Sequence, residues 1–213
     1  MAAKIPIGFR LLLACLFSGP VLFVTPAPAE WYVAGQGGVN FADRLTNVEG
    51  TGASTGILFQ DLDLQNSITV GGKIGYFPQH GWVGIEGEVF HSTPHIKGLG
   101  PDPGIHLRVT TIGANFILRY PGRTFQPYIG IGGGAVVARL GSAAGGVQSD
   151  TDLAGAWNVL AGIRAFVTPH IAVFTEYKFQ AATLQFDGAF GTAGGFESTF
   201  RAQHVLGGLS YHF

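Results

Sequence analysis

The chain has 213 residues, of which 12 are Lys or Arg and 13 are Asp or Glu, so its formal charge is −1. This balance, without any basic cluster, argues against a nucleic-acid-binding protein. The mean hydropathy is positive, yet beyond the first thirty residues no stretch of twenty is continuously apolar, a combination that membrane strands produce and membrane helices do not.

The first 29 residues have the pattern of a cleaved signal peptide. Lys4 and Arg10 precede an apolar run at 11–24, and Ala27-Pro28-Ala29 supplies a small-x-small site before Glu30. The alternative is a lipoprotein site at Cys15, but Arg10 leaves almost no apolar segment ahead of that cysteine. We therefore predict a signal peptide at 1–29 and one domain at 30–213, with ten basic and thirteen acidic residues left, a charge of −3.

In chain order, the remaining residues alternate between strand patterns, short turns and long polar segments. Strands are predicted at 31–41, 67–77, 82–91, 107–120, 126–140, 154–167, 171–183 and 200–213. Tight turns rich in Pro or Gly follow every second strand, and the long loops are predicted at 42–66, 92–106, 141–153 and 184–199. Short turns on one rim and long loops on the other predict an all-β fold, an eight-stranded antiparallel up-and-down transmembrane β-barrel.

The predicted strands 67–77, 82–91, 107–120, 154–167 and 171–183 each set a row of apolar residues against an opposite face with Lys, Arg or Glu side chains. Between 171 and 179, for example, Ile171, Val173 and Tyr177 alternate with Glu176 and Lys178. A soluble lipocalin-like barrel would place its apolar face inside, and periodicity alone does not separate the two cases. Aromatic residues near strand ends on the apolar face favour the membrane barrel, as an interfacial girdle: Tyr76, Tyr120, Trp157, Tyr177, Tyr211 and Phe213.

The charged faces predict an ion-paired barrel interior. An eight-stranded barrel is just wide enough to be filled by side chains, and charges enclosed there must pair. The predicted lumen network is Lys73, Glu86, Glu88, Arg119, Arg164, Glu176 and Lys178. Gly130, Gly132 and Gly134 would leave room for water or for a narrow gated path, so a small channel is kept as an alternative.

The last strand carries a resemblance to a known family. Together with the start at 31–38 and the segment 127–134, the terminal Leu209-Ser-Tyr211-His-Phe213 resembles the small outer-membrane β-barrels that include the OmpA transmembrane domain, OmpX and the opacity-type proteins. The resemblance implies that the barrel-assembly machinery reads Leu209, Tyr211 and Phe213, and that outer-membrane lipid and lipopolysaccharide surround the barrel. The functions of that family are diverse and include adhesion, host-factor binding and envelope structure.

Other chemical motifs are weak. The glycines after Gly130 match a dinucleotide fingerprint, but a strand follows them where a helix is needed, so we expect no cofactor. His91, His95 and His106 surround a loop rich in Pro and Gly. The four-residue spacing of His91 and His95 would suit a metal site only on a helix, and the Pro and Gly residues argue against a helix there. Ser92, beside His91 and near Glu88, and Ser198, beside Glu197, are candidate nucleophiles for a lipid-modifying enzyme, but they lack a recognisable triad context.

The long loops are the better candidates for function. The segment 45–65 holds Ile57, Leu58 and Phe59 among polar residues. These residues either pack together where strands extend above the membrane or form an adhesive surface or strand edge. We therefore expect a non-enzymatic surface protein with a structural, adhesive or recognition role. A porin-like diffusion channel and, less favoured, a lipid A-modifying enzyme remain the alternatives.

Overall fold

The computed structural model describes residues 29–213, except for 53–54, 57, 59–61, 64, 79–80, 97–104, 142–148 and 188–193. Residues 1–28, which hold nearly all of the predicted signal peptide, lie outside this range. Among the described residues, no helix is long and apolar enough to cross a membrane.

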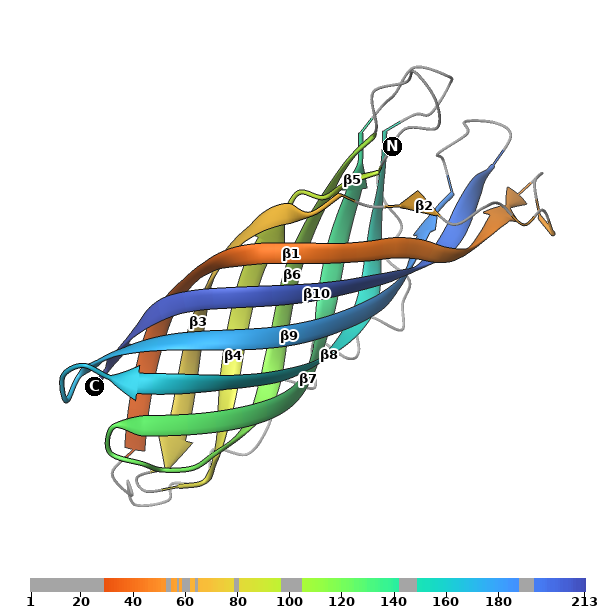
Figure 1. The fold of residues 1–213 in the computed structure, drawn as a ribbon. Helices are drawn as coiled ribbons and strands as arrows, with labels where there is room; N and C mark the ends of the chain where they lie inside the picture. The colour runs from red at the N-terminus through yellow and green to blue at the C-terminus, as the bar shows by residue number, and fades with distance from the viewer. Residues whose placement is uncertain are drawn as a thin grey trace, which may run out of the picture.

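Eight long antiparallel strands make a closed barrel, and two strands of two residues each extend it (Figure 1). The strands are β1 Ala29–Thr51, β2 Leu62–Asp63, β3 Ser67–Pro78, β4 Val83–Ser92, β5 His95–Ile96, β6 Ile105–Arg119, β7 Phe125–Leu140, β8 Asp150–Phe166, β9 Ile171–Phe186 and β10 Gly195–His212. The predicted fold class is thereby confirmed.

Closure comes from pairing of the first and last long strands. β1 pairs with β10 from Tyr32↔His212 to Thr51↔Gly195, and β1 pairs with β3 on its other side. Every long strand therefore has two neighbours, so in the described residues no backbone edge is left along the lower barrel wall. This matters in lipid, where no water is present to satisfy an unpaired N–H or C=O group.

Several strands run well past their predicted ends at the long-loop rim. β1 continues to Thr51 inside the predicted loop 42–66, and β8 begins at Asp150 inside the predicted loop 141–153. β9 extends to Phe186 and β10 begins at Gly195, which shortens the predicted loop 184–199. The predicted loop 92–106 shrinks only slightly. These loop boundaries were wrong because apolar residues placed in the loops continue the strand alternation and pack inside the barrel.

Along its lower part, toward the short turns, the barrel exposes an apolar belt. The outward side chains there are highly exposed: Ile68, Phe116, Ile131 and Leu209 each expose 60% or more of their surface. A wall this apolar would be unfavourable in water, and it matches the lipid-facing band of an outer-membrane barrel. The same side of the strands ends in aromatic residues at the short-turn rim, where Trp31 packs on Tyr76 and Tyr211 on Phe213.

Toward the long loops, the polarity of the wall reverses. In this zone, which we call the extension (45–51, 105–109, 136–140, 150–156, 182–186 and 195–202), outward positions such as Arg139, Gln185 and Arg201 are mainly polar. Most of the buried side chains there form one apolar cluster: Leu45, Val48, Leu107, Val109, Val136, Ala138, Leu140, Ala182, Leu184, Phe186, Phe196, Phe200 and Ala202. This pattern is that of a water-soluble β-structure with its own core.

The extension is built from two groups of strands, one that contains β7 and β8 and one that contains β9 and β10. The pairing of β8 with β9 stops at Ala156↔Ala182, whereas β7 and β8 stay paired to Leu140↔Asp150 and β9 and β10 to Phe196↔Phe186. Figure 1 shows the two groups separating toward the long-loop rim. Above the break, the backbone N–H of Gln185 donates to Oδ2 of Asp152 at 2.8 Å. Packing of the two inner faces therefore holds the extension together where the ladder has ended.

This packing predicts a large effect of Phe200→Ala. Phe200 is fully buried in the apolar cluster, so its removal should lower the free energy of unfolding by about 3–5 kcal/mol through lost burial and a cavity. Urea unfolding in lipid vesicles measures this change, with the exposed Thr183→Ala on the neighbouring strand as control. Equal effects of the two substitutions would show that the extension has no packed core.

Candidate functional site

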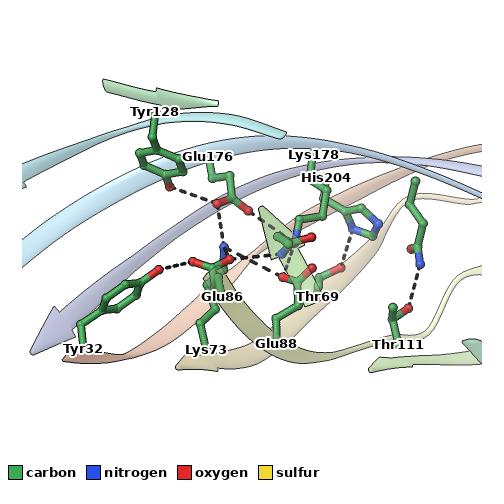
Figure 2. A network of polar contacts seen from close by, with 12 residues as sticks. Tyr32, Thr69, Lys73, Glu86, Glu88, Thr111, Tyr128, Glu176, Lys178 and His204 are labelled. Atoms are coloured by element: carbon green, nitrogen blue, oxygen red, sulfur yellow. Dashed lines mark hydrogen bonds and ion pairs between the residues drawn. The ribbon is translucent and has the colours of Figure 1, made fainter. Parts of the chain in front are cut away.

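Five charged side chains from three strands meet inside the lower barrel. Lys73 comes from β3, Glu86 and Glu88 from β4, and Glu176 and Lys178 from β9. The two members on β4 lie two positions apart, with one residue between them, and so do the two on β9, so the members of each pair point to the same face of their strand. The curvature of the barrel then brings β9 opposite β3 and β4, and the side chains of the two walls point toward one another (Figure 2).

The two lysines bridge the three carboxylates. Nζ of Lys73 lies 2.6 Å from Oε2 of Glu176, 3.1 Å from Oε1 of Glu86 and 3.9 Å from Oε2 of Glu88. Lys178 contacts Glu88 directly, and its Nζ lies 3.5 Å from Oε1 of Glu176. Each lysine thus joins the β4 wall to the β9 wall, and the network crosses the barrel.

The network is almost completely buried, and two tyrosines help to satisfy its excess negative charge. No more than 2% of any of the five side chains is exposed. Three carboxylates face two ammonium groups, so further donors are needed where water does not reach. The hydroxyl of Tyr128 donates to Oε2 of Glu176 at 3.0 Å, and the hydroxyl of Tyr32 donates to Glu86.

Both tyrosines lie across glycines on the neighbouring strand. Tyr32 pairs with Gly75, and Tyr128 pairs with Gly162. A Cβ atom at Gly75 would lie 2.1 Å from the Tyr32 ring, and one at Gly162 would lie 2.5 Å from the Tyr128 ring. Because these two positions are glycines, each tyrosine ring has the space to lie against the barrel wall and reach the carboxylates.

Arg119 and Arg164, which the sequence analysis included in the network, lie in the lumen but have other partners. The Arg164 guanidinium lies over the Tyr32 and Tyr128 rings, 4.3 and 5.6 Å from their centroids, a cation–π arrangement. Nη2 of Arg119 lies 2.6 Å from Oε2 of Glu30 at the short-turn end. The sequence analysis missed Glu30 and the tyrosines, although Tyr32 alternates in phase with the polar Gln36 and Asn40.

The short-turn end of the lumen opens into a cavity of about 670 Å³ with a mixed polar and apolar lining. Glu30 lines it and contacts both Arg119 and His212, whose Nδ1 lies 2.7 Å from Oε1 of Glu30. The Arg119 guanidinium also stacks 3.8 Å from the Phe77 ring centroid. Glu30, Arg119 and His212 thus form a second, smaller ion-paired group that lines the cavity.

The lumen is filled above the network as well. His204 contacts Thr69 through Nδ1 at 3.3 Å, and Gln180 donates to Thr111 at 3.0 Å (Figure 2). Side chains take up the space beside two of the glycines that the sequence analysis linked to a narrow path. A Cβ at Gly132 would lie 1.9 Å from Oδ1 of Asn115, and one at Gly130 would lie 2.7 Å from Cδ1 of Ile117. A path beside Gly130, Gly132 and Gly134 stays a prediction.

The candidate nucleophiles do not assemble into a triad. Ser92 is buried and points inward, whereas His91 lies on the opposite face of β4 and contacts Thr110 at 2.8 Å. Glu88 is engaged by Lys178. Ser198 is likewise buried, while its neighbour Glu197 is exposed.

The predicted histidine loop is only partly described. The side chains of His95 and His106 lie outside the described residues. Elsewhere in the described part of the chain, no three His, Cys, Asp or Glu side chains are arranged to hold a metal ion.

The terminal strand places its apolar side chains toward lipid. Leu209, Tyr211 and Phe213 all lie on the outer face of the barrel and expose 60, 47 and 69% of their surface. The strand that carries them is the one that closes the barrel against β1. Their predicted role as an assembly signal stays a prediction.

Comparison with known proteins agrees with this architecture. The outer membrane protein β-barrel domain family matches residues 11–213. The chain belongs to this family. A search of curated protein sequences found no match.

Two solved structures of small barrels share the fold. Neisserial surface protein A is 13% identical, with a TM-score of 0.53 over 87% of this chain and 99% of its own. OprG from Pseudomonas aeruginosa is 17% identical, with a TM-score of 0.51 over 85% of this chain and 95% of its own. Membership of the family implies location in the outer membrane, with the short turns on the periplasmic side and the long loops outside.

The network predicts that Lys73→Met is strongly destabilising. The substitution leaves Glu86 and Glu176 without their closest cation, and breaking a buried ion pair in this way costs about 3–5 kcal/mol. Urea unfolding of the barrel in lipid vesicles measures the loss, and Arg123→Met, at an exposed position on the short-turn rim, is the control. Adding Glu176→Gln to Lys73→Met should recover part of the loss, and no recovery would contradict the pairing.

Proposed function

We propose that the protein is a surface protein of the outer membrane, with a recognition or adhesion role exerted outside the cell, and that it is not a diffusion channel. The observation that carries the proposal is the extension, in which the strands continue past the lipid-facing belt and enclose an apolar core. A channel would gain nothing from such a core, whereas a surface that must bind a partner gains a rigid base.

The strand lengths support a base that stands clear of the membrane. A transmembrane strand needs about 9–11 residues, and β8, β9 and β10 have 17, 16 and 18. The extra residues lie at the long-loop rim, where the inward side chains change from polar to apolar. The loop tips at 97–104, 142–148 and 188–193, which complete the predicted recognition surface, lie outside the described residues.

The barrel interior argues against conduction. An ion would have to pass the central network, whose five side chains are closed off from water. It would then have to pass the apolar cluster, where desolvation of an unpaired charge is very costly. The ionic network and the apolar cluster are thus two successive barriers to an ion, which favours a closed lumen over a conducting one.

The proposal includes insertion of the barrel into the lipid of the outer membrane. Lipid and lipopolysaccharide would surround the belt, and the barrel-assembly machinery would insert the chain through the terminal strand with Leu209, Tyr211 and Phe213. The outward exposure of these three side chains supports this assignment.

The proposal predicts no ion conductance. The purified barrel in planar lipid bilayers should give no single-channel steps, because the network and the apolar cluster both close the lumen. Glu88→Gln together with Glu176→Gln, which weakens the network and leaves the cluster, should also stay silent. Steady conductance steps by the unaltered protein would favour the porin-like alternative.

It also predicts that the outer loops mediate binding. Cells that produce the protein should adhere to wells coated with extracellular-matrix proteins better than cells without it. Replacing 188–193 by a Gly-Ser segment of equal length should reduce adhesion. The same replacement of 121–124 on the opposite rim should not. Equal adhesion by cells with and without the protein would contradict the recognition role.

A further inference from the structure

Two arginines lie directly opposite each other on the outer wall of the barrel. Arg108 on β6 pairs with Arg139 on β7, and both side chains are exposed on the same face. Like charges at directly opposed positions of a sheet repel each other. Within the described part of the chain, no carboxylate forms an ion pair with either guanidinium. This positive pair is therefore unfavourable unless an anion joins it.

The height of the pair on the wall indicates where that anion would come from. Tyr120, at the short-turn rim, and Arg108 are twelve residues apart on the same face. A tilted membrane strand rises about 2.5 Å per residue, which puts Arg108 about 30 Å above Tyr120. The apolar band of such barrels is about 25 Å tall, so Arg108 lies just beyond it. Arg201 lies at an equal distance from Phe213 on β10.

The surroundings of the pair have the chemistry of a phosphate site next to lipid. A groove of about 490 Å³ is lined by His91, Thr93, Arg108, Thr110, Val137 and Arg139. Guanidinium groups bind phosphate through paired, charge-assisted hydrogen bonds, and threonine hydroxyls supply neutral donors. Ile112, two residues below Thr110 on the same face, exposes 60% of its surface and belongs to the apolar belt. The groove thus joins a polar upper end to a lipid-facing lower end.

We propose that Arg108 and Arg139 bind the phosphate of an anionic lipid in the outer leaflet, with the acyl chains lying along the belt below. The bound phosphate relieves the repulsion between the two guanidinium groups and fixes the depth of the barrel in the membrane. The site is on the outer wall and is independent of the recognition role proposed for the loops. A phosphorylated glycolipid such as lipid A has the required chemistry.

The test compares Arg108→Gln/Arg139→Gln with the unaltered barrel and with Arg123→Gln, an exposed arginine on the opposite rim. Each protein is folded in a neutral detergent, and binding of lipid A is followed by native mass spectrometry. The unaltered barrel and Arg123→Gln should bind alike. The double variant should bind at least about tenfold more weakly, as expected for the loss of two charge-assisted contacts. Equal binding by all three proteins would overturn the proposal.

Two further arms identify the ligand and guard against misfolding. Dephosphorylated lipid A should not distinguish the double variant from the unaltered barrel, whereas inorganic phosphate that displaces lipid A at equal concentration would overturn the lipid assignment. In neutral detergent alone, the double variant should resist urea at least as well as the unaltered protein, because the repulsion is gone. Lipid A should then stabilise the unaltered protein only, and equal stabilisation of the double variant would also overturn the proposal.

Discussion

The structure depends on one constraint, which is that a backbone inside lipid must satisfy all of its own hydrogen bonds. Pairing of β1 with β10 meets this constraint by removing the last free edge. Closure then decides where every side chain goes, because alternate residues of each strand must face the interior. With eight strands the interior is narrow, so inward charges from opposite walls come within contact distance, as Lys73 and Glu176 do at 2.6 Å.

Each wall strand passes from lipid into water while its alternation of inward and outward residues stays the same. On β9, the even-numbered residues face inward throughout, yet Glu176, Lys178 and Gln180 in the lower barrel give way to Ala182, Leu184 and Phe186 above. Lipid surrounds the lower part, so its polar side chains gather inside. Water surrounds the extension, so there the usual order of a soluble protein returns. The lower barrel thus has the residue arrangement of a membrane barrel, and the extension has that of a lipocalin-like barrel.

Under the proposed function, the lower barrel supplies stability and the extension supplies the base for recognition. The lower barrel combines an apolar belt, a buried ionic network and aromatic rings fitted against glycines, an arrangement that makes it rigid and closed. The similarity to neisserial surface protein A and OprG, at 13 and 17% identity, shows this fold alone. The outward arginines at the boundary of the zones are the point where the chain would sense the depth of the membrane.

From the sequence alone, the alternation of residues determined the eight strands and the antiparallel barrel, because period two follows from strand geometry itself. The aromatic residues near the strand ends then indicated that the seven predicted lumen charges face inward. The sequence did not determine which charges meet. Lys73 and Glu176 are 103 residues apart, and their contact depends on the register and stagger of the closed sheet. Arg119 binds Glu30 and Arg164 stacks on two tyrosines for the same reason. The loop boundaries also needed the tertiary structure, since residues such as Leu45 and Leu184 count as strand only when an opposite wall exists to bury them.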